Sequence, residues 1–406
     1  MRILLIHSNY DAFGGGEIYV SSLMRLLKAH GNDTFLFSFS NREEFTDESM
    51  CIVRDHFYDR DQYPGSYILR YFARFYINPR IILKLRHWIS QIKPDIIHIN
   101  ANDRYGISVL IALHGLRIPV IQSVHAYTVV CMSETSKKPF GELCRYSYGI
   151  ECFKNRCLPT WKFLAIAPSY ALKWNLTKRI VDRIIAPNNQ LKQRLLNCGA
   201  KNMSVIQHFV DRPLTLPDTS GVEPGNILCV GRISKEKGFQ YVILSMLEVR
   251  NEFPAAVLHI CGDGPYLDEL KLLSKSLNLD QAVQFHGYVN QNDLGGFYER
   301  ANVVVFPSMC LEICGLVNLE ALAYARPLIV SDQCGVEGLF IDELTVNPSD
   351  VRLLSGNILS VLKDRDRFQE MSKNSYDLYN RRYSPEIHYE RLYREYSELQ
   401  AKRRSA

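Results

Sequence analysis

The chain has 406 residues, which is more than one hydrophobic core usually serves, so two domains are expected. Hydrophobic residues make up 47% of it, and no apolar run approaches the roughly 18 residues of a membrane span, which argues against a membrane-spanning helix. The net charge of +5 hides an asymmetry, because residues 1–207 carry +11 and residues 208–406 carry −6. A basic first half favours an acidic partner such as anionic lipid or a diphosphate, and nothing in the chain resembles a nucleic-acid-binding module.

The opening segment RILLIH is short and runs into polar residues, so it is interpreted as a strand and not as a signal peptide. Together with eleven cysteines, the lack of a leader favours a reducing cytoplasm. Gly14, Gly15 and Gly16 follow, and a helix is expected over 18–27. This order opens a Rossmann-like half, but the loop lacks G-x-G-x-x-G, which disfavours a nicotinamide cofactor. The glycines either let a ligand approach the backbone or form an ordinary tight turn.

Strands and helices alternate through the rest of the first half. Strands are expected over 34–39, 95–100 and 119–125, and helices over 79–92 and 107–116. Such alternation predicts a parallel sheet covered on both faces, which binds ligands at the carboxyl ends of its strands. His125 ends the last of these strands, so it is either a ligand-facing residue or a structural histidine.

Residues 67–93 interleave aromatic and basic side chains at helical spacing, and Pro79 divides them into two helices. The segment suits a membrane interface, or it forms two helices packed on the sheet with their arginines in water. The basic residues concerned are Arg70, Arg74, Arg80, Lys84 and Arg86.

Four cysteines lie in a loop-like stretch, residues 128–160, directly after His125. They are Cys131, Cys144, Cys152 and Cys157, with the spacing C-x12-C-x7-C-x4-C. A zinc site usually has tighter C-x2–4-C pairs at both ends, so free thiols or a disulfide formed after purification are preferred to zinc. Because the stretch follows His125 directly, it is expected to line a site at that residue.

A linker rich in proline and glycine, residues 213–225, precedes a second run of alternating elements. A strand at 226–230 leads into the loop GRISKEKG at 231–238, and a helix follows at 239–249. Arg232 and Lys237 therefore stand between the end of a strand and the start of a helix. Two cations so placed can bind a diphosphate and neutralise charge as it leaves. The alternative is a pair of solvated surface charges.

The most informative stretch is 303–326, where an apolar strand at 303–306 is followed by a loop and then a helix that begins near Gly315. The start of a helix leaves N–H groups free and carries a partial positive charge, which suits a phosphate. Glu312 precedes the helix and Glu320 lies just over one turn into it. One carboxylate can reach over a bound phosphate group and the other a hydroxyl-bearing part of the same ligand, although two glutamates at this spacing also occur by chance.

Together these motifs resemble the retaining family 4 glycosyltransferases of the GT-B fold. The E-x7-E pattern from Glu312 to Glu320, with Gly315 three residues after the first glutamate, is similar to their donor-site motif. The string G-R-x3-E-K-G at 231–238 matches their donor-phosphate motif, and GDGP at 262–265 is also typical. The resemblance covers nearly the whole chain and is strongest over 226–335.

The chain also departs from the family pattern. Cys314 stands where the family usually has phenylalanine, and Ala325 where it usually has glycine. His208-Phe209 replaces Asn-Gly before Val210-Asp211. After the strand at 119–125, His125-Ala126-Tyr127 resembles the family's His-Asp-x segment with alanine for aspartate.

The resemblance implies an α/β fold of GT-B type, with two Rossmann-like domains facing across a cleft. Residues 1–207 would form an acceptor-binding domain, 208–380 a nucleotide-sugar-binding domain, and 381–406 a helix crossing back to the first domain. Glu312 would hold sugar hydroxyls, Glu320 the ribose diol, and His125 would face the donor sugar. The implied catalytic residues are Glu312, His125, Arg232 and Lys237, and the implied donor-binding residues are Gly15, Gly16, Arg232, Lys237, Cys314, Gly315, Leu316, Val317 and Glu320.

The implied reaction moves a sugar from a nucleoside-diphosphate sugar to a hydroxyl of a glycan or lipid-linked acceptor, with retention and without a metal or other cofactor. The D-x-D strings at 59–61 and 364–366 do not end apolar strands, so they are interpreted as solvated charges. The enzyme would work in the cytoplasm, at the inner face of a membrane, in the synthesis of a lipopolysaccharide or exopolysaccharide. Alternatives are a nucleotide-sugar epimerase or hydrolase on the same fold, or a non-catalytic subunit that binds sugar nucleotides.

Overall fold

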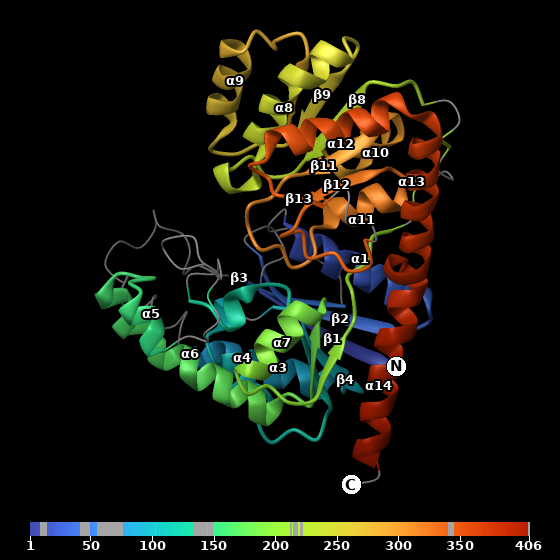
Figure 1. Ribbon diagram of the computed structural model, residues 1–406. Coiled ribbons are helices and arrows are strands. Elements are labelled where there is room, and N and C mark those ends of the chain that lie inside the picture. Colours follow the sequence, from blue (N-terminus) through green and yellow to red (C-terminus); the bar gives the residue numbers. More distant parts are fainter. Residues whose placement is uncertain are drawn as a thin grey trace. The chain divides into compact units, whose positions relative to one another are not determined.

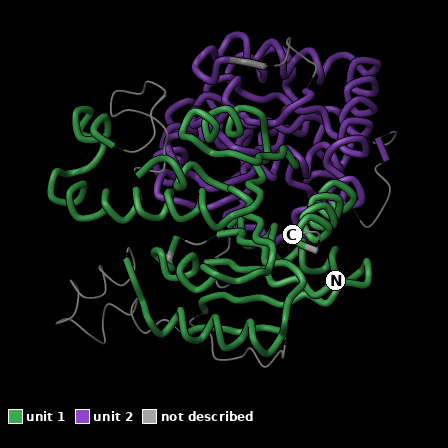
Figure 2. The backbone as a smooth tube through the Cα atoms, turned by 90° about the horizontal axis from the view of Figure 1, so that it is seen from below, with its two compact units in different colours: residues 1–206, 389–406 green, residues 207–388 purple. Residues whose placement is uncertain are grey.

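The computed structural model describes residues 1–8, 14–40, 49–54, 76–101, 103–132, 144, 149–211, 213, 218–219, 222–339 and 345–404. The chain forms two compact units, unit 1 with residues 1–206 and 389–406 and unit 2 with residues 207–388 (Figure 2). Each unit contains one parallel sheet with helices packed on it (Figure 1). The predicted α/β class is therefore confirmed.

Unit 1 has a seven-stranded parallel sheet in the order β3-β2-β1-β4-β5-β6-β7. Its strands are β1 (Arg2–His7), β2 (Asp33–Ser40), β3 (Met50–Arg54), β4 (Ile96–Ile99), β5 (Val120–Ser123), β6 (Arg183–Ala186) and β7 (Met203–Val205). Its helices are α1 (Gly15–Ala29), α3 (Pro79–Ile92), α4 (Ser108–Leu113), α5 (Ile150–Lys154), α6 (Thr160–Ile180) and α7 (Asn189–Asn197). Residues 3–6 of β1 are fully buried. A parallel strand that helices cover on both faces is buried along its length, which is why this one is continuously apolar.

Helix α3 shows how the second part of the aromatic and basic segment 67–93 is packed. Residues 67–75 of that segment lie outside the described residues. Pro79 opens the helix, and the side chain of Asn78 caps it by accepting a bond from the amide of Arg80 at 3.1 Å. Trp88 packs edge-on against Phe35. The described half of the segment therefore packs on the sheet of unit 1.

Unit 2 has a six-stranded parallel sheet in the order β10-β9-β8-β11-β12-β13. Its strands are β8 (Asn226–Val230), β9 (Val257–Cys261), β10 (Val283–Gly287), β11 (Val303–Phe306), β12 (Leu328–Ser331) and β13 (Thr345–Val346). Its helices are α8 (Phe239–Glu252), α9 (Leu267–Ser276), α10 (Gln291–Arg300), α11 (Leu316–Ala323), α12 (Val351–Lys363) and α13 (Arg365–Leu378).

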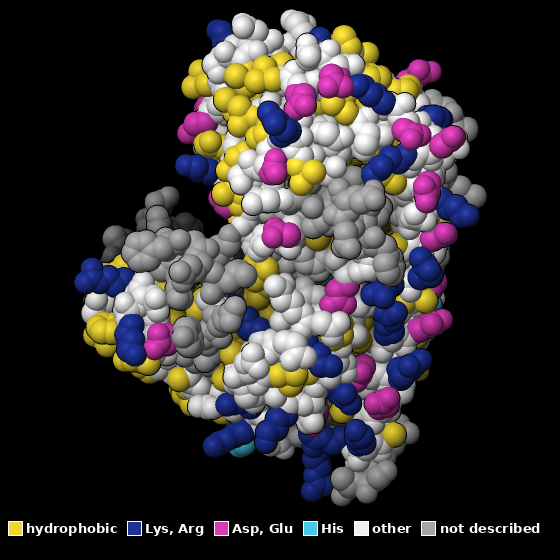
Figure 3. Space-filling model, in the orientation of Figure 1, with side chains coloured by type: hydrophobic (Ala, Val, Ile, Leu, Met, Phe, Trp, Pro, Cys, Tyr) yellow, Lys and Arg dark blue, Asp and Glu magenta, His cyan; other side chains and the backbone are white. Residues whose placement is uncertain are grey.

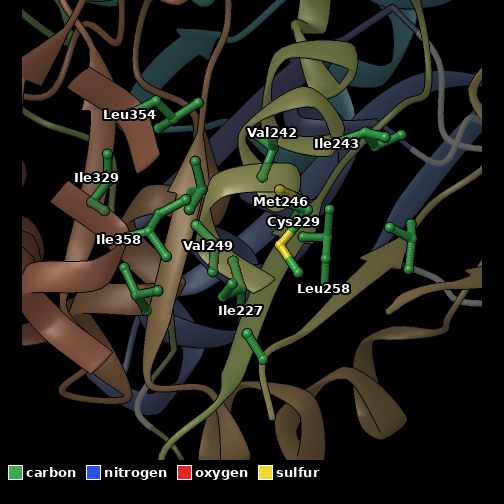
Figure 4. Close-up of a cluster of buried hydrophobic side chains, with 14 of the residues drawn as sticks. Ile227, Cys229, Val242, Ile243, Met246, Val249, Leu258, Ile329, Leu354 and Ile358 are labelled. Carbon is green, nitrogen blue, oxygen red and sulfur yellow. The ribbon is translucent and has the colours of Figure 1, made fainter. Parts of the chain in front are cut away.

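The main core of unit 2 joins helices α8 and α12 to the sheet. Ile227 and Cys229 of β8 lie beneath Val242 and Met246 of α8, and Ile358 of α12 completes the layer (Figure 4). Each of these side chains is fully buried. This packing fixes β8 in the middle of the sheet, so the loop that follows it at 231–238 is held by a rigid strand.

The C-terminal segment differs in detail from the single helix expected from Arg381 onward. A π-helical turn, Tyr379–Tyr383, follows α13. Helix α14 (Pro385–Arg404) then begins with proline, whose missing N–H would have had no hydrogen-bond partner within the helix. From Tyr389 the helix belongs to unit 1. There Tyr396 Oη lies 2.6 Å from Nδ1 of the buried His98, and Glu395 forms an ion pair with Arg183 at 3.2 Å.

Among the described residues, no helix is both long enough and apolar enough to cross a bilayer. The D-x-D string at 59–61 lies outside those residues. In the other, Asp364 caps α13 by accepting a bond from the amide of Arg367 at 3.0 Å. That aspartate therefore has a structural role as a helix cap.

Candidate active site

In unit 2, the loop after β8 packs tightly on the segment after β11. Gly238 has a φ of +76°, and a Cβ there would lie 2.0 Å from the carbonyl oxygen of Pro307, so only glycine is compatible with this contact. The amide of Met309 donates to the carbonyl of Glu236 at 2.8 Å, which adds a second tie between the two segments. These two contacts place Lys237 beside the residues that precede α11.

Lys237 and Glu312 form a sheltered ion pair. Their Nζ and Oε1 atoms lie 2.5 Å apart, and the two side chains are only 19% and 16% exposed. Ser308 Oγ donates to the same carboxylate oxygen at 2.7 Å, and the ammonium lies 5.4 Å from the centre of the Phe306 ring. The structure thus brings together two of the predicted catalytic residues and fixes both side chains before any ligand arrives.

Arg232 lies on the same loop but in a different environment. Its side chain is 69% exposed and forms an ion pair with Glu236 at 3.1 Å. Burial opposes ionisation of Glu236, but the neighbouring polar groups and the charges of Arg232 and Lys237 lower its pKa. Arg232 is therefore held loosely and can turn toward an anionic ligand, whereas Lys237 is fixed.

The start of α11 presents backbone N–H groups. Gly315, with a φ of +56°, precedes the helix, and a Cβ there would lie 2.8 Å from Nδ2 of Asn318. No side chain caps this end, and Gly315, Leu316 and Val317 are all partly exposed. Because the first N–H groups of a helix have no intrahelical partner, this end can bind an anion. Asn318, whose buried amide has no hydrogen-bond partner, was not expected from the sequence.

Glu320 is buried inside α11 and already holds two donors. Gln291 Nε2 donates to one carboxylate oxygen at 2.7 Å and Tyr298 Oη to the other at 2.6 Å. Burial raises the pKa of Glu320, and the two hydrogen bonds oppose that rise. A carboxylate offers about four acceptor positions, so two remain for the hydroxyls of a ligand. Gln291 and Tyr298 orient the group and were not identified from the sequence.

Two departures from the family pattern are neighbours in unit 2. Cys314 is buried, its thiol lies against the backbone of His208, and burial raises its pKa to about 12. Phe209 is 2% exposed and its ring lies 4.6 Å from that of His388. The two departures therefore meet where the thiol of Cys314 contacts the backbone of His208. Ala325, the third departure, has a φ of +53°.

In unit 1, His125 lies beyond the carboxyl end of β5. Its Nε2 is 3.3 Å from Oδ1 of Asn100, which follows β4, and its ring is 4.7 Å from that of Tyr19 in α1. Gly15 and Gly16 form the first turn of α1, with Gly14 as its N-cap. The predicted unit 1 residues therefore lie at one edge of the sheet, where parallel sheets bind ligands.

An acid–base pair at the same edge was missed in the sequence. His7 ends β1, is 3% exposed, and its Nε2 lies 3.6 Å from Oε1 of Glu17 in α1. Neither ring nitrogen of His7 has a hydrogen-bond partner. The available signal was a polar residue directly after an apolar strand, followed by an acidic residue in the first turn of the next helix.

A hollow lined by both polar and apolar side chains lies beside β5 in unit 1. Gln122 Oε1 is buried there without a hydrogen-bond partner. Burial lowers the pKa of Lys173 to about 8, and the charge of Asp103 opposes that change. The hollow is lined by Asp103, Gly106, Gln122, Thr128, Val129, Ser169, Tyr170, Lys173, Trp174 and Thr177. Its donors and acceptors suit a hydroxyl-bearing ligand.

None of the four cysteines after His125 forms a disulfide, and Cys131 and Cys152 are buried. Burial raises the pKa of Cys152 to about 11, and the thiols of Cys157, Cys131 and Cys144 lie near enough to raise it further. Burial also raises the pKa of Cys157, so Cys152 and Cys157 are thiols at neutral pH. In the part of the chain that the structure describes, no group of three or more histidine, cysteine, aspartate or glutamate residues is arranged to hold a metal ion. The stretch expected as a loop also contains the short helix α5.

Comparison with known proteins bears on the family and the fold of the chain. The sequence profile described as Glycosyl transferases group 1 matches residues 219–378, and that of Glycosyltransferase Family 4 matches residues 13–212. A sulfoquinovosyl transferase of Arabidopsis thaliana is 26% identical over 319 residues, which cover 77% of this chain and 57% of that protein. The chain thus spans less than two thirds of the length of this relative.

Two solved structures share the fold over nearly their whole length. Sucrose-phosphate synthase from Thermosynechococcus elongatus superimposes with a TM-score of 0.74 at 19% identity, covering 99% of both chains. Anabaena HepE in complex with UDP gives a TM-score of 0.72 at 16% identity, covering 98% of this chain and 100% of that one. From the two profiles and this fold, the chain belongs to the family 4-type glycosyltransferases with the GT-B fold.

Proposed function

We propose that this glycosyltransferase moves a sugar from a nucleoside-diphosphate sugar to a hydroxyl acceptor with retention at the anomeric carbon. The observation that carries the proposal is the Lys237–Glu312 ion pair at 2.5 Å, formed by two loops that meet beside the open end of α11. A cation and free N–H groups suit a diphosphate, and a carboxylate suits sugar hydroxyls. The UDP bound to the HepE structure supports a nucleotide donor.

The protein would act mainly by positioning the reactants and stabilising the departing diphosphate. Lys237, Arg232 and the N–H groups of Leu316 and Val317 would neutralise its growing charge. Glu312, held by Lys237 and Ser308, would accept bonds from hydroxyls of the transferred sugar. Glu320 would accept bonds from the ribose diol at its two unused acceptor positions. The leaving phosphate would help to take the acceptor proton, and no metal is required by this scheme.

Unit 1 would bind the acceptor, which we propose to be a lipid-linked or cell-surface glycan intermediate handled at the inner face of a membrane. The basic charge of residues 1–207 supports an anionic partner, and the hollow beside Gln122 supplies donors and acceptors for hydroxyls. Gln122→Ala is expected to raise the KM for the acceptor and leave the KM for the donor unchanged. An equal rise in both would contradict this assignment.

The proposed reaction is tested by incubating the protein with each common nucleoside-diphosphate sugar and a lipid-linked glycan extract. Mass spectrometry should detect one acceptor species heavier by one sugar residue, together with the free nucleoside diphosphate. NMR of the product should show the anomeric configuration of the donor. Release of free sugar without a glycosylated product would instead identify a hydrolase.

A further inference from the structure

The first half of helix α6 in unit 1 is apolar on the face that it turns to solvent. Ile166, Trp174 and Thr177 form its buried face. On the opposite face Trp161 is 64% exposed, Leu164 63% and Leu172 45%. With Pro168 these residues recur every three or four positions, which places them on one stripe of the helix. A solvent-facing stripe normally carries polar residues, as this one does further along at Asn175 and Arg179.

Helix α5 enlarges this surface. Ile150 is 64% exposed and Phe153 is 42% exposed. The rings of Phe153 and Phe163 lie 5.6 Å apart, so α5 packs against the start of α6. Beneath them Met132, Cys152 and Ile166 form a small core of their own. The exposed apolar residues therefore sit on a preformed support. We call this surface the α5–α6 patch, consisting of Ile150, Phe153, Trp161, Leu164 and Leu172.

Basic residues surround the α5–α6 patch. Residues 149–180 contain six lysines and arginines and a single acidic residue, Glu151, which is paired with Lys154 at 3.1 Å. Lys154 and Arg156 are exposed, and Lys162 is partly exposed next to Trp161. Figure 3 shows apolar and basic side chains together over α5 and the first part of α6. Apolar and aromatic residues beside basic ones are typical of an interfacial membrane contact.

We propose that the α5–α6 patch docks unit 1 on an anionic lipid surface, with Trp161 and Leu164 among the lipids and Lys154, Arg156 and Lys162 at the headgroups. A second copy of the chain is a poorer occupant, because a symmetric contact would bring these like charges together. The charges of α3, in contrast, are partly used within unit 1. Lys84 donates to the carbonyl of Ile52 at 2.9 Å and Arg86 to that of Ala112 at 3.1 Å.

The proposal rests on the proposed function only for its purpose, which is to bring unit 1 to a lipid-linked acceptor. It can be tested with no donor present, by co-sedimentation with vesicles of phosphatidylcholine alone or mixed with phosphatidylglycerol. The wild type should sediment with the anionic vesicles at low salt and be released as salt rises, because screening weakens exposed charges. The Trp161→Ser, Leu164→Ser double variant should lose at least tenfold in partitioning. Leu272→Ser is the matched control, since Leu272 is 67% exposed on α9 of unit 2.

Tryptophan fluorescence gives a second readout. Among the three tryptophans of the chain, Trp161 is the one that is mostly exposed, whereas Trp174 is 6% exposed. Anionic vesicles should therefore shift the emission to shorter wavelength, and Trp161→Phe should remove the shift while keeping most of the sedimentation.

Several results would overturn the proposal. One is a wild type that stays in the supernatant with anionic vesicles at low salt, and another is a double variant that sediments like the wild type. A wild type that is dimeric by sedimentation velocity, with a monomeric double variant, would assign the patch to a second copy. Calorimetry with nucleoside diphosphates keeps the two claims apart. If the wild type binds nucleotide but not anionic vesicles, the docking surface alone is refuted. If it binds anionic vesicles but no nucleotide, the proposed function alone is refuted.

Discussion

The junctions between the first strand and the first helix of each sheet differ in the charges that flank them. In unit 1, β1 leads through Gly14 into α1, and Glu17 faces the buried His7 at 3.6 Å. In unit 2, β8 leads into the loop at 231–238, and Lys237 faces Glu312 at 2.5 Å. In both junctions a glycine lies directly before the helix, Gly14 before α1 and Gly238 before α8. One offers an acid and an imidazole, and the other offers cations.

The difference favours two kinds of ligand on one backbone plan. A cationic loop beside the open end of α11 attracts a diphosphate, because both contribute positive potential. The Glu17 carboxylate in the first turn of α1 contributes no attraction to an anion, and it suits hydroxyl groups instead. We therefore assign the diphosphate to unit 2 and expect Glu17 to contribute little to nucleotide affinity.

The largest expected effect comes from removing a cation of the unit 2 loop. Lys237→Ala should cost roughly 2–4 kcal/mol of transition-state stabilisation, by analogy with loss of one preorganised donor. Arg232→Ala should cost less, because Arg232 is exposed and held only by Glu236. The measurement is kcat/KM with the identified donor and acceptor, with circular dichroism as the check on folding. If both variants keep near-native turnover, the cationic loop is not the leaving-group site.

A smaller effect separates the two glutamates of unit 2. Glu320→Ala should weaken binding of the free nucleoside diphosphate by roughly 1.5–3 kcal/mol, the range for hydrogen bonds to a charged group. Glu312→Ala should lower turnover and nearly keep that affinity, because Glu312 is assigned to the sugar. Calorimetry with the free nucleotide decides, and equal losses in both variants would end this division of roles.

The acid side of the pH profile should reflect Glu320. Burial raises the pKa of Glu320 in the folded state, so it protonates at a higher pH than an ordinary glutamate. Nucleotide affinity should therefore fall on acidification before an exposed carboxyl would titrate. Because of the same shift, ionised Glu320 lowers the free energy of unfolding at pH values above its pKa in the folded state. This destabilisation disappears below the pKa of the same group in the unfolded chain. The Glu320→Gln variant should accordingly bind nucleotide weakly at every pH, and its melting temperature at pH 8 should be no lower than that of the wild type. If nucleotide affinity of the wild type stays constant down to pH 5, the assignment is contradicted.

The smallest effect concerns the backbone of unit 2. Ala325 has a φ of +53°, a conformation that costs a residue with a Cβ about 1–2 kcal/mol and glycine little. Ala325→Gly should raise the free energy of unfolding by about 1 kcal/mol or less, since glycine also loses more entropy on folding. Urea denaturation measures it, and a clear loss of stability would show that the left-handed backbone is not strained here.

Features set by neighbouring residues could be predicted from the sequence. The apolar strands and the glycines at 238 and 315 are local, because a strand and a left-handed turn each depend on a few adjacent residues. Partners from distant elements could not be predicted in this way. Glu320 is oriented by Gln291 and Tyr298, which lie 29 and 22 residues away in the chain. Their selection depends on how α10 and α11 pack.

Helix α6 shows the second limit. Pro168 normally ends a helix, yet it lies inside α6, between the buried residues Ile166 and Trp174 that hold both halves against unit 1. Tertiary packing overrides the local signal there. The same helix is apolar on two faces, so its residues alone do not tell which face is buried and which carries Trp161 to the surface.

The central claim is that a diphosphate binds to the cationic loop of unit 2. It is tested most directly by calorimetric titration of UDP, GDP, ADP, CDP and dTDP into the wild type, Lys237→Ala and Glu17→Ala. At least one nucleotide should bind the wild type, bind Lys237→Ala at least tenfold more weakly, and bind Glu17→Ala no more weakly than the wild type. Binding that weakens equally in Lys237→Ala and Glu17→Ala, or no binding of any of the five to the wild type, would contradict the claim.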